Sequence, residues 1–366
     1  MKLRQTLTAL ACIALALPAC KDDIKPDAAR ESASAKPKDE PAKKDGPKEA
    51  SASSSASAAP SGPSNPAPTD ASGIPASATG VLADGVADGI LKSGALPIVK
   101  LVAPGEEPRA ALSYELTEDK KQTTGMRMNL DMTMQAGETA VPPTKLPQIG
   151  MNVELAAGKK EAGGDIQVTG TVTKVAITAN DPSEDAMTKA LSPVMNGMKG
   201  MTIKYFVSSK GRARDVQVTM PPGADANATQ VLEQMKQSFD SMVAPLPDEP
   251  VGVGASWVVI SRLKTGADIL QFTTYTLKSR KGAKVELDTA VKQLAASAAL
   301  SGAGGGAGHV TKFLSSGTGS SSLDLTSLAP DKGTATVTGS MGLEAGAMGS
   351  MAVETKVKID FSGPLP

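Results

Sequence analysis

The chain has 366 residues, enough for one large or two modest domains. It carries 38 basic and 38 acidic residues, so no net charge draws it to nucleic acid or to an anionic membrane surface. Aromatic residues make up only 2% of the chain, and base-stacking sites need aromatic side chains among basic ones. The composition therefore argues against nucleic-acid binding.

Residues 1–19 predict a lipoprotein signal peptide. Lys2 and Arg4 precede an apolar run from Leu7 to Ala19, which is shorter than the roughly 20 residues that span a bilayer. The run ends Leu17-Pro18-Ala19-Cys20, which resembles the lipobox of bacterial lipoproteins. We expect Cys20 to receive the lipid, and no other cysteine follows it to form an internal disulfide. An ordinary secretory signal that ends near a cysteine is the alternative.

The lipid makes a membrane the expected partner of the mature chain. One acyl chain anchors a protein only weakly, but two or three chains on one cysteine make the attachment effectively permanent. Position 21 is Lys21, whereas Asp is the familiar signal for retention in the inner membrane. The sequence therefore favours the outer membrane over the inner one.

Residues 20–80 predict a disordered tether. Ala, Ser, Pro, Lys, Asp and Glu dominate this stretch, and it contains no aromatic residue. Such a segment buries too little apolar surface to offset the entropy lost on ordering. The tether would hold the folded part, residues 81–366, away from the membrane.

Strand patterns dominate the folded part. Met126 to Gln135 alternates apolar and polar residues with a period of two, as an antiparallel strand with one dry face does. Lys210-Gly211 predicts a hairpin turn. Further strands are expected at Ala111–Thr117, Met151–Leu155, Asp165–Thr178, Thr202–Ser208, Ala213–Thr219, Ser256–Leu263, Ile269–Leu277, Lys284–Leu287, Ser321–Leu325, Thr334–Thr338 and Met351–Phe361. Few large residues lie between Ser315 and Gly349, which predicts thin, exposed or edge strands there.

Two amphipathic helices are expected against this sheet. One begins at Asp181, where Asp, Pro and Glu form a helix-start pattern, and continues past Pro193 to Met198. The other runs from Asp225 to Val243, and Val81 to Leu91 predicts a short third helix weakened by glycines. The predicted fold is α+β, with a long-stranded, curved, half-barrel-like antiparallel sheet. A duplication with halves near 98–222 and 223–366 is one interpretation, and a single domain is the other.

No motif for catalysis or for a cofactor is present. The chain has no Gly-x-Ser-x-Gly elbow and no phosphate-binding loop of the Gly-x-x-x-x-Gly-Lys type. Its single histidine, His309, cannot build a zinc site alone. We therefore expect a protein without catalytic residues, metal or cofactor.

Methionine is the unusual feature of the composition, because 16 methionines outnumber the aromatic residues. They suit three structures: a core in which Met replaces Phe and Leu, an adaptable groove for an acyl chain, or a copper(I) thioether site. The metal is the least favoured, because no Cys or His lies nearby. The groove would be lined by residues of the alternating strand and the first helix: Met128, Leu130, Met132, Val194 and Met198.

Several segments together resemble the bacterial lipoproteins of domain-of-unknown-function family 6263. They are the lipobox and tether, the opening from Pro104 to Tyr114, the stretch Met198-Lys199-Gly200-Met201-Thr202, and the run from Leu246 to Trp257. The resemblance covers about Ile98 to the end and implies no particular activity.

Two hypotheses follow. The first is a non-enzymatic envelope lipoprotein whose curved sheet binds a lipid or another hydrophobic ligand. The second is a structural or protein-interaction module with a fully packed core. The sequence identifies no protein partner.

Overall fold

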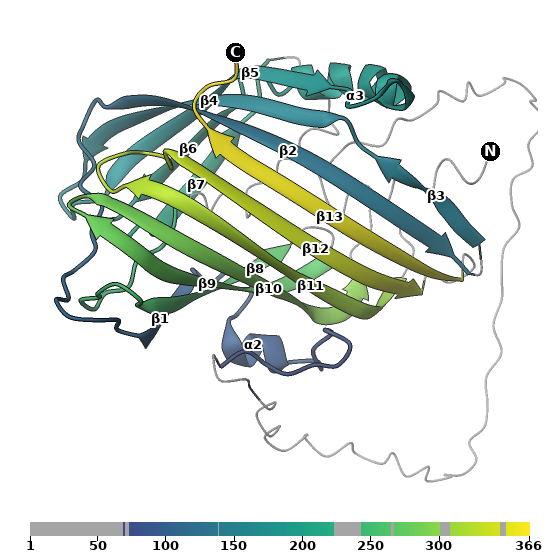
Figure 1. Cartoon of the computed structure of the whole chain (residues 1–366), viewed down its shortest axis with the longest axis horizontal. Coiled ribbons are helices and arrows are strands. Elements are labelled where there is room, and N and C mark those ends of the chain that lie inside the picture. Colours follow the sequence, from purple (N-terminus) through teal and green to yellow (C-terminus); the bar gives the residue numbers. More distant parts are fainter. Residues whose placement is uncertain are drawn as a thin grey trace, which may run out of the picture. The chain divides into compact units, whose positions relative to one another are not determined.

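The computed structural model describes Thr69 and residues 73–137, 139–222, 243–264, 267–300, 308–344 and 349–366, but not the side chains of Pro142 and Val194 (Figure 1). The predicted signal peptide, Cys20 and most of the predicted tether lie outside these residues. So does the predicted second helix, except for Val243. None of the described helices is long and apolar enough to cross a membrane.

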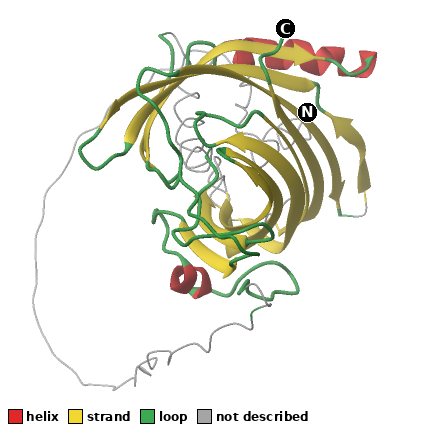
Figure 2. Cartoon of the chain, turned by 60° about the vertical axis from the view of Figure 1, so that its left-hand side comes forward, coloured by secondary structure: helices red, strands yellow, loops and turns green. Residues whose placement is uncertain are grey.

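Thirteen strands of the described residues form one antiparallel sheet, which confirms the predicted sheet type. The order is β1-β8-β9-β10-β11-β12-β13-β2-β4-β5-β6-β7, and β3 pairs with β2 beside this path. Figure 2 shows that the sheet curves strongly, and within the described residues its edge strands β1 and β7 do not pair with each other. The strands are β1 (Ile98–Ala103), β2 (Lys121–Ala136), β3 (Thr139–Lys145), β4 (Gln148–Lys160), β5 (Ile166–Thr178), β6 (Thr202–Val207), β7 (Ala213–Thr219), β8 (Ser256–Lys264), β9 (Ala267–Lys281), β10 (Lys284–Leu300), β11 (Gly308–Asp324), β12 (Lys332–Glu344) and β13 (Ser350–Ser362).

The two faces of the sheet differ in chemistry, as the alternation in β2 predicts. One face, which we call the Met face, carries the apolar residues of β2 and the residues in register with them on the other strands. The opposite face, which we call the polar face, carries the alternate residues. In β2 these two sets are Met126, Met128, Leu130, Met132 and Met134 on the Met face and Arg127, Asn129, Asp131 and Thr133 on the polar face.

The polar face becomes apolar where the short helix α2 (Val86–Ile90) covers it. Leu82, Ala87 and Leu91 of this region pack against Ile260 of β8 and Phe272 of β9. Strand β8 is therefore buried on both faces, which explains its nearly continuous apolar sequence in an antiparallel sheet. Helix α2 is shorter than the predicted helix and begins after Gly85, whose φ is 79°.

The predicted helix start at Asp181 is confirmed. The Asp181 carboxylate accepts a hydrogen bond from the Ser183 backbone N–H at 2.8 Å, at the start of the 3-10 helix η1 (Pro182–Glu184). Helix α3 (Asp185–Asn196) follows and contains Pro193. Its residues Leu191 and Met195 pack against Met-face side chains of β4 and β5, whereas Met187 is 37% exposed and lies outside the contact.

The predicted strand at Ala111–Thr117 is wrong. This segment has no regular secondary structure, and its backbone bonds to turns of other strands instead. The Tyr114 N–H donates to Ser209 O at 2.7 Å, and the Glu115 N–H donates to Leu325 O at 2.8 Å. Alternation of Leu112, Tyr114 and Leu116 reflects burial of one side of an extended segment, not a place in the ladder.

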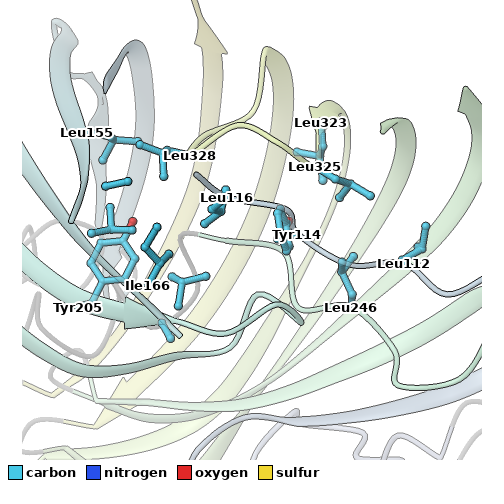
Figure 3. Close-up of a cluster of buried hydrophobic side chains, with 14 of the residues drawn as sticks. Leu112, Tyr114, Leu116, Leu155, Ile166, Tyr205, Leu246, Leu323, Leu325 and Leu328 are labelled. Atoms are coloured by element: carbon cyan, nitrogen blue, oxygen red, sulfur yellow. The ribbon is translucent and has the colours of Figure 1, made fainter. Parts of the chain in front are cut away.

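This segment holds together one end of the sheet. Figure 3 shows Tyr114 and Leu116 between Leu155 and Tyr205 on one side and Leu323 and Leu325 on the other. These side chains belong to a large buried cluster, which we call the end cluster, with members from every strand from β4 to β11. The two predicted halves of the chain thus share one core and one sheet.

Of the thin, exposed or edge strands predicted between Ser315 and Gly349, the edge position is wrong, because β11 and β12 lie in the middle of the sheet, although most of their residues there are exposed or half-buried. Their many small residues have a steric reason. A Cβ on Gly317 would lie 2.5 Å from Thr336 O, and one on Gly319 would lie 2.6 Å from Thr334 O. Glycine therefore permits these strands to approach closely in the curved sheet.

A short segment before α2 lies between β10 and β11. In this inserted segment, Thr79–Leu82, Thr79 O accepts from the Phe313 N–H at 2.7 Å, and Gly80 O accepts from the Ala295 N–H at 2.9 Å. Leu82 N–H donates back to Ala295 O at 2.9 Å. Strands β10 and β11 have no register pairs here between Gln293–Ser315 and Ala299–His309, so the inserted segment fills a gap in the ladder.

Candidate functional site

The structure brings together only some of the predicted groove residues. Met128 and Met198 belong to one small cluster around Ile149 and Met195. Met132, only 5% exposed, belongs to a different cluster, and Leu130 is 3% exposed. The side chain of Val194 is outside the described part. Two of the five residues are therefore neighbours, and two are too deeply buried to present a surface.

The cross-strand register arranges the Met face into four rows. Each row crosses β9, β10, β11, β12, β13 and β2. In the last row, Leu277 and Leu287 belong to the end cluster. The rows are Gln271, Gln293, Ser315, Gly339, Thr355 and Met132; Thr273, Val291, Gly317, Val337, Val357 and Leu130; Tyr275, Thr289, Gly319, Ala335, Ile359 and Met128; and Leu277, Leu287, Ser321, Gly333, Phe361 and Met126.

A half-buried apolar surface lies in the second to fourth rows. We call it the central strip; its members are Val291, Val337, Val357, Ile359, Phe361 and Met126. None of the six belongs to a packed cluster formed by the described residues. The strip lies between the end cluster and the cluster of Met132, Met134 and Phe313. The alternation of apolar and polar residues in β13 indicates this strip, whereas the predicted groove was placed on the methionines of β2 and the first helix.

A row of hydrogen-bonded polar side chains borders the central strip. Gln271 Nε2 donates to Thr273 Oγ1 at 3.2 Å, and Gln293 Nε2 donates to Gln271 Oε1 at 2.8 Å. Ser315 Oγ donates to Gln293 Oε1 at 2.6 Å. This glutamine row, Thr273, Gln271, Gln293 and Ser315, lies on the Met face between apolar residues. Its amides and hydroxyls stay uncharged at any ordinary pH.

The polar face has two hollows on the described residues. The larger, of ≈ 610 Å³, crosses five strands from β10 to β2 beside Ser77 and is lined by Asp131, Lys292, Glu354 and Lys356, with several hydroxyls. The second, of ≈ 530 Å³, is lined mostly by Thr and Ser, with Asp288. Positive and negative side chains alternate in the larger hollow, so neither sign of charge dominates there.

Charged side chains make local pairs at the rim of the sheet. Hydrogen bonds to Asp165 and Glu161 raise the pKa of Arg214, whose guanidinium lies 4.6 Å from the centre of the Phe206 ring. Hydrogen bonds to the Asp268 carboxylate raise the pKa of Arg262.

In the part of the chain that the structure describes, no three His, Cys, Asp or Glu side chains gather as a metal site would require. His309 is exposed at the start of β11.

The three tyrosines lie at the end cluster and are buried or partly buried. Burial raises the pKa of Tyr114 and of Tyr205, and raises that of Tyr275 to about 12. The Tyr114 hydroxyl donates to Ala244 O at 3.1 Å, and Tyr275 stacks on Trp257 with ring centroids 5.7 Å apart. These contacts hold the end cluster together.

Comparison with known proteins assigns no family to the chain. No family model matches the chain, and no curated protein matches it. A solved structure of lipovitellin, described as "Lipid-protein interactions in lipovitellin", is similar over 69% of this chain, with 11% identity and a TM-score of 0.35. The chain spans only 26% of the length of that protein.

Proposed function

We propose that this chain is a non-enzymatic lipoprotein, exported and held to the outer membrane by lipid on Cys20, and that its Met face binds an apolar ligand. The central strip is the observation that supports ligand binding. It presents half-buried apolar side chains from β10, β12, β13 and β2, between the end cluster and the cluster of Met132, Met134 and Phe313. Each methylene that a ligand buries there contributes about 0.8 kcal/mol.

A pair of neighbouring substitutions tests which face binds. Val337 lies on the Met face, and the next residue, Thr338, lies on the polar face and lines its larger hollow. The chain from residue 21 to 366, purified without detergent, would be titrated with the apolar dye diphenylhexatriene. We expect V337D to abolish the rise in dye fluorescence and T338D to leave it unchanged, with far-UV circular dichroism confirming that both fold.

The opposite result would place binding on the polar face, and no dye binding by the parent would contradict the proposal. If V337D does not fold, V357T supplies the test, because it keeps the side-chain volume and removes only part of the apolar surface. In that case a fewfold weaker affinity is expected.

The anchor has its own test. Expression of the full chain in a bacterium with lipoprotein processing should give a membrane-bound product that carries the mass of a diacylglyceryl group on Cys20. C20S should lose this mass and appear in the soluble fraction of the envelope after cleavage at another site, or keep its signal peptide. A wild-type chain without the added mass would contradict the anchor and leave ligand binding untouched.

The second candidate function is a protein-interaction module that works through the polar face. The two hollows lined by hydroxyls and alternating charges favour it. This function predicts that T338D, and not V337D, weakens binding to a protein partner.

A further inference from the structure

The glutamine row indicates which chemistry an apolar ligand would carry at one end. Three of its members lie in the first row of the Met face, and Thr273 lies in the second row, in register with Val291 of the central strip. Rows on a strand are roughly 7 Å apart, so the glutamine row and the far end of the strip at Phe361 are separated by roughly 20 Å. That distance suits a long acyl chain with a polar group at one end.

Hydrogen-bonding capacity remains in the row. Each glutamine amide has two N–H donors and two acceptor lone pairs on its oxygen. In the bonds made among the row's own members, Gln293 uses one N–H towards Gln271 and one lone pair towards Ser315. A second donor and a second acceptor of Gln293 are therefore left for a carbonyl or a hydroxyl group.

Charge is missing from the same surface. The four Met-face rows contain no Asp, Glu, Lys or Arg. A carboxylate or phosphate bound there would meet no cation on these four rows, and burial of an unpaired charge is far more costly than burial of a hydrogen-bonded neutral group. The row therefore discriminates against fatty acids and phospholipid headgroups.

We propose that the ligand is a neutral amphiphile, with its acyl chain on the central strip and its uncharged ester or hydroxyl group bound by Gln293 in the glutamine row. This inference rests on the proposed function of the Met face. A monoacylglycerol has the required chemistry.

The test uses competition against diphenylhexatriene on the chain from residue 21 to 366. Two competitors with the same chain, monododecanoylglycerol and dodecanoate, are compared below the concentrations at which they form micelles. We expect the glyceryl ester to displace the dye at a concentration at least tenfold lower than the carboxylate. Q293M, which keeps the shape of the side chain, should weaken the ester about three- to tenfold, as expected for one uncharged hydrogen bond, and should leave dye binding unchanged.

Q217M is the matched control, because Gln217 is exposed on β7, away from the row. It should leave both competitors unchanged. If Q293M does not fold, S315A removes a hydroxyl from the same row and should weaken the ester.

The outcomes separate the two proposals. A parent that does not bind the dye overturns the proposed function itself. A parent that binds the dye but takes dodecanoate as well as the ester, or a Q293M variant with an unchanged ester affinity, overturns the neutral-amphiphile inference alone.

Discussion

At the scale of single residues, Gly80 shows how closely the inserted segment approaches the sheet. A Cβ at this position would lie 1.6 Å from Phe313 O, and φ is 73°, in the left-handed region. Gly73 has a similar φ of 78°, but its Cβ would meet no atom within 4 Å. The two glycines therefore separate the effect of a clash from the effect of backbone strain.

We predict that G80A displaces the inserted segment, whereas G73A costs only the roughly 1 kcal/mol of a left-handed alanine. Hydrogen exchange measured at the backbone amides of Ala295 and Phe313 should become faster in G80A and stay slow in G73A, because both amides donate to the inserted segment. Equal protection in the two variants would contradict this account.

The tyrosines give a prediction for alkaline pH. An unfolded tyrosine loses its proton near pH 10, but burial raises the pKa of folded Tyr275 to about 12. The folded state thus holds its proton where the unfolded state releases it. The contribution of the buried tyrosines to the free energy of unfolding should be fully present below pH 10. It should decrease from pH 10 to 12, by up to about 1.4 kcal/mol per pH unit for each buried tyrosine.

In Y275F this decrease should be shallower, because one of the three tyrosines no longer titrates. Urea denaturation at several pH values between 9 and 12, compared with the wild type, measures the difference. The same slope in both proteins would mean that Tyr275 ionises freely in the folded state.

At the scale of secondary-structure elements, Arg262 joins α2 to the sheet. Its Nε and Nη2 donate to the two oxygens of Asp268, each at 2.8 Å, and its Nη1 donates to Leu91 O at 2.9 Å and to the Asp88 carboxylate. The Arg262 side chain is only 7% exposed. Removal of one partner of such a buried pair leaves the other charge without compensation.

We predict that R262M lowers the free energy of unfolding by about 3 kcal/mol and exposes residues 73–97 to proteolysis. R109M is the control, because the Arg109–Glu107 pair is exposed, with side chains 38% and 72% accessible. It should change stability by less than about 0.5 kcal/mol. Denaturant titration and limited proteolysis measure both effects. Similar losses of stability in the two variants would contradict the stabilising role of the Arg262 contacts.

The sequence predicts some elements well for a physical reason. In β2, large apolar and polar residues alternate on two faces in different environments, so the strand and its dry face could be predicted. In β11 and β12, small residues allow neighbouring strands to lie close together. A run of small residues is also typical of loops and edge strands, so the sequence alone does not distinguish these cases. The irregular segment at Ala111–Thr117 alternates like a strand, because a buried extended chain has the same period.

The candidate site was only partly predictable for related reasons. Met128 and Met198 could be placed together, since a strand with an amphipathic helix after it predicts that contact. Gln271 and Gln293 look solvent-facing in sequence, because their burial depends on a neighbour 22 residues away in the next strand. The register that creates the glutamine row is a property of the assembled sheet.

At the scale of the whole molecule, the end cluster makes the two halves of the chain one folding unit. Leu155 and Tyr205 come from the first half and Trp257 and Leu323 from the second, with Leu112 among them at 0% exposure. We predict a single unfolding transition, in which the fluorescence of Trp257 and the far-UV circular dichroism change together. L112A should shift both signals equally, at a cost of about 3 kcal/mol. A second transition seen by circular dichroism alone would contradict a shared core.

The inserted segment also determines how the protein would carry a mechanical load. A pull on the chain before Ile74 reaches the sheet at Ala295 and Phe313, in the middle of the sheet and not at an edge strand. The Val81–Ala295 bridge is parallel, so the backbone bonds on either side of it are strained together when the chain is pulled along β10. Such a load would therefore be shared by β10 and β11, two long strands inside the sheet, and would not fall on an edge strand.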